Sequence, residues 1–300
     1  MSAMVLRCFL SCPAYGPVDE DASITMISQA QATAERHGWH LEVAESCRII
    51  RPAGDWQLDE QLRQRELTAA LDHDLWWLGR GGYGCVAMLP ALLRESAATS
   101  CRLIGFSDAT VLHCAWAATG RGESLYAPMP GIAHGPRARH CLDGALQGSV
   151  LRYNQDSDPT AQVIRPGTAA GPVFAACLSV FAGMVGIPAM PDVSGHILAL
   201  EDIDERPYRV DRALWQLHLA GHLRRVSALV WGLMPHQSPP GYDGPEMAEV
   251  MIDWARRLEI PTLCGLPFGH HPDPLTLINN RPSQLVAATD GTWHLAQEGR

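Results

Sequence analysis

The sequence predicts an α/β fold with a parallel sheet in its first third and an α+β arrangement in its second half. In the first third, short apolar runs typical of strands alternate with segments of helical periodicity, a pattern that indicates a parallel sheet with both faces covered. The second half also holds strand-like runs and helices, and we expect mixed or antiparallel pairing there. A hydrophobic content of 47% supports a sizeable core across the 300 residues.

The first third divides into elements at clear stop signals. The helix expected over 22–37 ends before Gly38, and the wholly apolar run 75–78 indicates a strand buried on both faces. That strand runs into the glycine-rich loop Arg80–Gly84. The expected strands are 4–10, 39–43, 75–78 and 103–104, and the expected helices are 22–37, 59–71, 88–93 and 111–118. Sites in such sheets lie beyond the carboxyl ends of the strands.

The composition of the middle of the chain predicts a domain boundary there. Residues 121–170 are punctuated by Pro, Gly, Arg and Asp and have little periodicity. We therefore expect an N-terminal domain over 1–135, a linker over 136–165 and a C-terminal domain over 166–300. The later expected strands are 196–201, 226–231, 262–266 and 284–288, and the later helices are 208–219 and 246–258.

Composition excludes several classes of function. A net charge of −9 with a pI of about 5.8 argues against nucleic acid or an anionic membrane as partner. No apolar run approaches the roughly 20 residues of a membrane span, and the N-terminus lacks the pattern of a signal peptide, so we expect a cytoplasmic protein. The chain has no lysine, which excludes a Schiff base or a Ser–Lys dyad within it. Its nine cysteines form no CxxC pair and indicate reduced thiols.

The segment Gly105–Ala109 has the pattern of a nucleophile elbow, the sharp strand-to-helix turn that exposes a serine hydroxyl. Ser107 follows an apolar strand, has a small residue two positions away on either side, and precedes a helix. Small flanks are needed because the turn brings the neighbouring backbone close. The alternative is that Ser107-Asp108 only caps a helix.

A serine nucleophile needs a base and an orienting acid. His270 follows a strand on a loop shaped by Gly and Pro, with His271 beside it as competitor; a metal site at His270, His271 and Asp273 is the alternative. Glu201 closes an apolar strand, although the acidic residues just after it could belong to a solvated turn. The acid lies across the expected domain boundary from Ser107, which suggests a site in a cleft between two domains.

Four blocks in this order resemble the LD-carboxypeptidase family of serine peptidases, which includes muramoyltetrapeptide carboxypeptidases and microcin C immunity peptidases. They are Arg80–Gly84, Gly105–Thr110, Leu200–Arg212 and Pro267–His270. The resemblance implies Ser107 as nucleophile, His270 as base and Glu201 as orienting acid. It also implies a Rossmann-like N-terminal domain, a smaller β-rich C-terminal domain and a homodimer.

Two segments depart from the family pattern. The chain has Tyr126-Ala127-Pro128 where family members usually carry His-Gly-Pro, and Ala175-Ala176-Cys177 where they carry Gly-Gly-Asn. The added Cβ atoms alter any close backbone approach, and the lost asparagine removes a donor and an acceptor.

The resemblance implies a serine hydrolase that releases a C-terminal, D-configured amino acid from a murein-type peptide through an acyl-enzyme. We expect oxyanion donors at Gly82 and Asp108 and substrate contacts at Arg80, Tyr83 and Arg209. We expect no cofactor, no metal and no partner beyond a small peptide-like substrate and a second copy of the chain. The alternatives are a microcin-type hydrolase acting on peptidyl nucleotides and a non-catalytic binding protein on the same scaffold.

Overall fold

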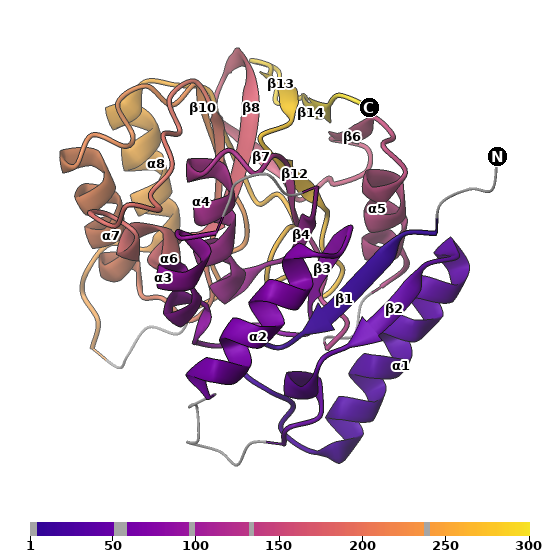
Figure 1. The fold of residues 1–300 in the computed structure, drawn as a ribbon. Helices are drawn as coiled ribbons and strands as arrows, with labels where there is room; N and C mark the ends of the chain where they lie inside the picture. Colours follow the sequence, from indigo (N-terminus) through magenta and orange to yellow (C-terminus); the bar gives the residue numbers. More distant parts are fainter. Residues whose placement is uncertain (1–4, 51–58, 96–99, 132–134, 237–240) are drawn as a thin grey trace.

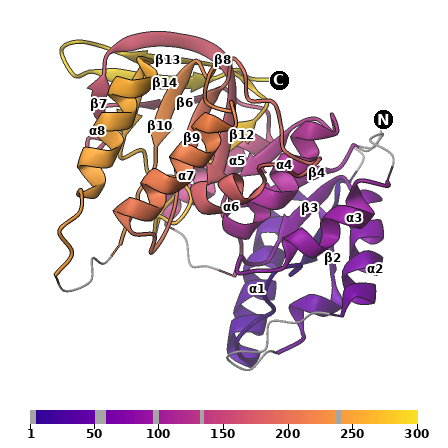
Figure 2. The ribbon, with the colours of Figure 1, turned by 90° about the vertical axis from the view of Figure 1, so that its left-hand side faces the viewer.

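The computed structural model describes residues 5–50, 59–95, 100–131, 135–236 and 241–300; Met4, where the first strand was expected to begin, lies outside them. Two sheets form the framework, and helices cover them (Figure 1). The N-terminal elements lie on one side of the molecule and the C-terminal elements on the other (Figure 2). The predicted α/β fold class is confirmed. No helix within the described ranges is both long and apolar enough to cross a membrane.

The first sheet has the strand order β12-β5-β4-β3-β1-β2. Its parallel strands are β1 (Arg7–Ser11), β2 (His40–Val43), β3 (Leu75–Leu78), β4 (Arg102–Gly105) and β5 (Ser124–Tyr126), and β12 (Leu277–Asn279) pairs antiparallel with β5. Helix α1 (Glu20–His37) covers one face, and α2 (Glu60–Leu71) and α3 (Leu89–Leu92) cover the other (Figure 2). Because strand order reverses at β1 and β3, the loops after these two strands meet at the edge where doubly wound sheets bind ligands.

The second sheet is mixed, as predicted, with the order β6-β14-β13-β8-β9-β10-β11-β7. Strands β8 (Gly167–Cys177), β9 (Ile197–Glu201), β10 (Ala228–Trp231) and β11 (Thr262–Cys264) are parallel neighbours. Antiparallel pairs join β6 (Leu151–Asn154), β7 (Gln162–Arg165), β13 (Pro282–Ala287) and β14 (Trp293–Gln297) to them. The later helices are α6 (Leu178–Gly183), α7 (Pro207–Leu219) and α8 (Met247–Leu258).

The segment 136–165 differs from the irregular linker that we expected. It holds helix α5 (Pro136–Leu146) and the strands β6 and β7. Helix α5 begins at a proline, which suits the first helical position, and buries one stripe of small and apolar side chains: Ala138, Cys141, Leu142 and Ala145. This stripe is short and surrounded by arginine, histidine and glycine, so the periodicity is weak in the sequence. The domain limits themselves stay a prediction.

Strand β12 joins the two sheets: although it follows strands of the second sheet along the chain, it pairs with β5 of the first sheet and contacts β8 of the second. Its Asn279 side chain is fully buried and bonds to the backbone of β8 in the second sheet. Oδ1 accepts from the Ala175 N–H at 2.7 Å, and Nδ2 donates to the Ala175 carbonyl at 3.2 Å. One amide thus satisfies a buried donor and a buried acceptor, both of which would otherwise lack partners.

We expect Asn279→Ala to lower the free energy of unfolding by about 2 kcal/mol, because it leaves the Ala175 N–H and C=O buried without partners. Urea denaturation measures the loss. Gln284→Ala, which truncates an exposed polar side chain on β13, serves as control and should stay within about 0.5 kcal/mol of the wild type. Equal effects of the two substitutions would show that the Asn279 amide does not join the sheets.

Candidate active site

Ser107 stands at a sharp turn between β4 and helix α4 (Thr110–Ala118). Its φ is +65°, a left-handed conformation that is uncommon for a residue with a side chain and costs about 1 kcal/mol or more. A Cβ added at Gly105 would lie 3.2 Å from the Cβ atoms of both Ala109 and Leu78. The turn is therefore the strained strand-to-helix bend that the sequence predicted, and its small flanks have a steric cause.

Ser107, His270 and Glu201 form a chain of hydrogen bonds. His270 Nε2 lies 3.2 Å from Ser107 Oγ, and His270 Nδ1 lies 2.8 Å from Glu201 Oε2. A carboxylate only accepts, so Nδ1 carries the proton and Nε2 faces the serine hydroxyl. The backbone N–H of His270 also donates to Glu201 Oε2, at 3.2 Å. This order of groups is the one that activates a serine nucleophile.

Glu201 is fully buried at the carboxyl end of β9, and two glycines make room for it. A Cβ at Gly232, just after β10, would lie 2.5 Å from Glu201 Cβ. A Cβ at Gly269 would overlap Glu201 Cδ, and the φ of Gly269 is +67°. The loop that carries His270 can approach the carboxylate this closely only because residue 269 is glycine.

Tyr126 is a site residue that the sequence analysis noted only as a departure from the family pattern. It is fully buried at the end of β5. Its hydroxyl donates to Glu201 Oε1 at 2.6 Å and accepts from the Ser107 N–H at 3.3 Å. No motif pointed to this contact, because it depends on how β5 and β9 of different sheets face one another.

The two adjacent histidines have opposite surroundings. Burial lowers the pKa of His270, but the hydrogen bond and the charge of Glu201, with smaller effects of Asp202 and Asp204, outweigh burial and raise it above the ordinary value. Burial, with the nearby charge of Arg137, lowers the pKa of His271. His270 is thus prepared to accept a proton, whereas His271 is kept neutral.

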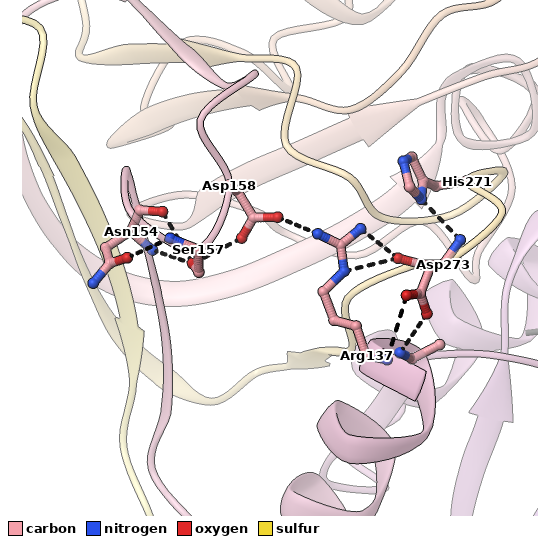
Figure 3. Close-up of polar contacts among 7 residues, drawn as sticks. Arg137, Asn154, Ser157, Asp158, His271 and Asp273 are labelled. Carbon is pink, nitrogen blue, oxygen red and sulfur yellow. Dashed lines mark hydrogen bonds and ion pairs between the residues drawn. The ribbon is translucent and has the colours of Figure 1, made fainter. Parts of the chain in front are cut away.

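His271 belongs to a separate network, which Figure 3 shows. Its Nδ1 accepts from the Asp273 N–H at 2.9 Å, and the Asp273 carboxylate accepts from the backbone N–H of Ala138 at 2.7 Å. Arg137 donates to the Asp273 carbonyl and pairs with the buried Asp158. These contacts anchor the His270 loop to the start of α5. No group of three metal-ligating side chains occurs in the described ranges, so the alternative of a metal at His270, His271 and Asp273 has no support.

A pocket of about 300 Å³ opens onto Ser107 and His270. Its other lining residues come from the segments after β1, β3, β4 and β5 and from α1: Val18, Ala22, Arg80, Gly81, Gly82, Phe106, Met129 and Gly131. A Cβ at Gly81 would lie 3.0 Å from Ser107 Oγ, so the glycine loop passes directly over the hydroxyl. Gly82 has a φ of +126°, and a Cβ there would overlap the ring of Tyr15.

The structure separates the expected substrate-binding residues. Arg80 lines the pocket, and its Nη1 donates to the Gly16 carbonyl at 3.0 Å. Tyr83 is half exposed and is not among the lining residues. Arg209 lies on α7, 57% exposed, pairs with Glu205 at 3.6 Å and faces a different pocket. The expectation that Arg209 contacts the substrate is therefore not supported by its position, because residues of α7 do not reach the Ser107 pocket.

Asp108 and Asp202 have structural contacts next to the site. The buried Asp108 carboxylate accepts from the Cys85 N–H at 2.8 Å, which ties the elbow to the segment after the glycine loop. Asp202 is also buried, so it is not part of a solvated turn. It accepts from the Ser179 N–H at 2.7 Å and from the Cys177 thiol at 3.4 Å. Cys177 thus supports the residue that follows Glu201 and does not line the pocket.

Comparison with known proteins matches both halves of the chain to one family. Residues 10–127 match the LD-carboxypeptidase N-terminal domain, and residues 170–285 match the LD-carboxypeptidase C-terminal domain. A Synechocystis protein named as a carboxypeptidase is 33% identical over 218 residues, 71% of this chain and 70% of that protein. The murein tetrapeptide carboxypeptidase of Pseudomonas aeruginosa is 31% identical over 206 residues, 65% of this chain and 66% of that protein.

Solved structures share the whole fold. The crystal structure of muramoyltetrapeptide carboxypeptidase from Oxalobacter formigenes superposes with a TM-score of 0.82 at 25% identity, over 97% of this chain and 99% of that one. The microcin C7 self-immunity protein superposes with a TM-score of 0.80 at 19% identity, over 99% of this chain and 97% of that one. At that identity the second likeness concerns the fold alone.

The opposite pKa shifts predict that His270 and His271 titrate on opposite sides of the ordinary histidine value of about 6.5. His270 should bind its proton at higher pH than a free histidine, because its charged form gains the Glu201 carboxylate. NMR titration of the imidazole resonances measures both, with His270→Gln and His271→Gln for assignment. A His271 resonance that titrates at higher pH than that of His270 would contradict the arrangement.

Gly269→Ala should reduce activity by about 100-fold, because the added Cβ displaces Glu201 and a misplacement of about 1 Å costs that much. Gly38→Ala is the matched control: its φ is also +67°, but an added Cβ meets no atom within 4 Å. We expect the control to lose about 1 kcal/mol of stability and no activity. Assays and thermal unfolding of the two variants separate the clash from backbone strain; equal activity in both would refute the clash.

Proposed function

The chain belongs to the LD-carboxypeptidase family, and from this premise we propose that it uses a Ser107–His270–Glu201 triad to release the C-terminal, D-configured amino acid of a murein-type tetrapeptide. This proposal rests on the hydrogen-bond chain from Ser107 Oγ through His270 to Glu201, whose first two members line a pocket. It supplies a nucleophile, a base and an orienting acid within hydrogen-bond reach.

In the proposed reaction, Ser107 Oγ attacks the scissile carbonyl while His270 Nε2 takes its proton. The resulting imidazolium lies against the Glu201 carboxylate, which stabilises it. His270 then gives the proton to the leaving amine, and the peptide stays on Ser107 as an ester. A water molecule, deprotonated by His270, hydrolyses this ester and restores the free serine.

We propose that the N–H groups of Gly82 and Asp108 stabilise the oxyanion. Gly82 lines the pocket, and Asp108 follows the nucleophile at the start of the turn into α4. The Ser107 N–H already donates to Tyr126, which favours the N–H of the next residue as the donor. Preorganised donors of this kind typically contribute 10²–10³-fold in turnover.

Recognition of the substrate carboxylate falls to Arg80 in this proposal. It lines the pocket together with Ser107, and a guanidinium matches a carboxylate in a bidentate geometry. Arg209 faces another pocket, where its side chain is 57% exposed and pairs with Glu205, which is 25% exposed. A preference for peptides with a free C-terminal carboxylate is consistent with this arrangement.

We also propose a place for the protein in the cell. Its likeness to the murein tetrapeptide carboxypeptidase of Pseudomonas aeruginosa supports a role in peptidoglycan recycling, and its nine cysteines, all free thiols, agree with a cytoplasmic location. The family resemblance further implies a homodimer. The proposed chemistry needs no cofactor, because the nucleophile is a side chain.

Ser107→Ala, His270→Ala and Glu201→Ala should each lower kcat on murein tetrapeptide by roughly 10⁴-fold, since triad members act as a unit. The triple variant should be no worse than Ser107→Ala alone. Chromatographic assay of the released amino acid measures turnover, and circular dichroism checks that the variants are folded.

A triple variant far slower than Ser107→Ala would mean that the three groups act independently and that the triad is misassigned. An acylated nucleotide amide is the comparison substrate. Cleavage of that compound by the wild type, with no detectable tetrapeptide hydrolysis, would replace the murein substrate with a peptidyl nucleotide. Full activity of Ser107→Ala on either substrate would exclude the serine mechanism.

A further inference from the structure

Tyr126 is a buried titratable residue in contact with the triad that the proposed reaction does not use. It stands at the end of β5, directly beside β4, with Tyr126 opposite Gly105 in the pairing. Strand β12 flanks it on the other side, where Tyr126 pairs with Leu277. The residue is therefore held between β4 and β12 of the first sheet while its hydroxyl reaches Glu201 of the second.

Aromatic side chains next to two triad members hold the ring in place. Phe106, which precedes Ser107, lies 6.2 Å from it between ring centroids, and Phe268, two residues before His270, lies 6.1 Å from it. Both contacts are edge-to-face, the geometry that aromatic pairs prefer. Phe106 also meets the His270 ring edge-to-face at 5.0 Å. The tyrosine thus has one fixed position relative to the elbow and to the His270 loop.

The hydroxyl of Tyr126 closes a ring of hydrogen bonds around the site. Starting from Ser107 Oγ, the ring runs to His270 Nε2, through Nδ1 to Glu201 Oε2, across the carboxylate to Oε1, on to the Tyr126 hydroxyl and back to the Ser107 N–H. Burial and the neighbouring Glu201 charge raise the pKa of Tyr126 well above its ordinary value. The phenol therefore stays protonated and donates a hydrogen bond to the Glu201 carboxylate.

We propose that Tyr126 is a positioning residue for the triad, whose hydroxyl holds the second carboxylate oxygen of Glu201 and the backbone of the Ser107 elbow at the same time. This inference rests on the proposed serine mechanism. It gives the Tyr126-Ala127-Pro128 segment a role that its sequence alone did not suggest: the aromatic residue spans the gap between the two sheets at the site.

The hydrogen bond also influences the proton affinity of the His270–Glu201 pair. Donation by Tyr126 withdraws negative charge from the Glu201 carboxylate and so limits how strongly that carboxylate stabilises a protonated His270. Without the donor the carboxylate attracts the proton of the pair more strongly, so the pair binds a proton more readily and its apparent pKa rises. The acid limb of the pH–rate profile should then move to higher pH.

Tyr126→Phe removes the hydroxyl and keeps the ring, and the rate of Ser107 labelling by a fluorophosphonate probe across pH tests the proposal without a natural substrate. We expect labelling to be about 10- to 100-fold slower, because a misplacement of reacting groups by up to about 1 Å costs up to about 100-fold. The acid limb should rise by about one pH unit. Unchanged labelling and an unmoved limb would overturn the role of Tyr126.

Tyr153→Phe is the matched control. Tyr153 is also buried, and its hydroxyl donates to the Thr276 carbonyl at 2.6 Å, outside the ring of bonds at the site. It should show a comparable loss of thermal stability and an acid limb at the wild-type pH. An equal shift of the limb in both variants would mean that any lost buried hydroxyl produces the effect, and would also overturn the proposal.

Two further readouts keep the outcomes distinct. Ser107→Ala must abolish labelling; probe bound equally by wild type and Ser107→Ala would refute the serine mechanism itself. In the unmodified protein, NMR should show a slowly exchanging, downfield proton on the Tyr126 hydroxyl, as a 2.6 Å bond to a buried carboxylate produces. Its absence would show that the bond does not form, whatever the stability of Tyr126→Phe.

Discussion

The carboxylate of Glu201 has no exposed surface, and every hydrogen bond it accepts comes from another part of the chain. A buried charge without partners destabilises a protein by several kcal/mol, so β9 can end in glutamate only if the partners are present. Tyr126 belongs to the first sheet, and His270 lies on the loop after β11. Gly232 and Gly269 leave the space that the Glu201 side chain needs. The hydrogen bonds that form the site therefore also connect the two sheets.

Much of the fold could be predicted because local signals were strong. Helix α1 ends before Gly38, as the sequence indicated, with Gly38 in the left-handed conformation, and the apolar run of β3 is fully buried. The small residues around Ser107 are needed because the backbone there is tightly packed. The α/β class follows from the alternation of strands and helices along the first third of the chain. His270 stood out because it lies on a loop shaped by Gly and Pro after a strand, and Glu201 because it ends an apolar strand. Their roles were implied by the family resemblance.

The rest depended on contacts between distant segments. Strand β12 is three residues long and pairs with β5, about 150 positions earlier, so no pattern within a short window could reveal it. Helix α5 has too narrow a buried stripe to outweigh its charged residues. The contact of Tyr126 with Glu201 arises where two sheets face one another, and Arg209 on α7 lines a pocket other than that of Ser107. These are properties of the assembled core.

In the proposed mechanism, Ser107 carries the substrate as an ester during turnover. Rapid acid quenching of the protein with murein tetrapeptide, followed by mass spectrometry after cleavage at arginine, tests it most directly; the chain has no lysine, so Ser107 falls within the peptide 103–121. During turnover this peptide should gain the mass of the tetrapeptide acyl group without its C-terminal amino acid. Turnover with an unmodified 103–121 peptide at every quench time, or with the acyl group on another peptide, would contradict it.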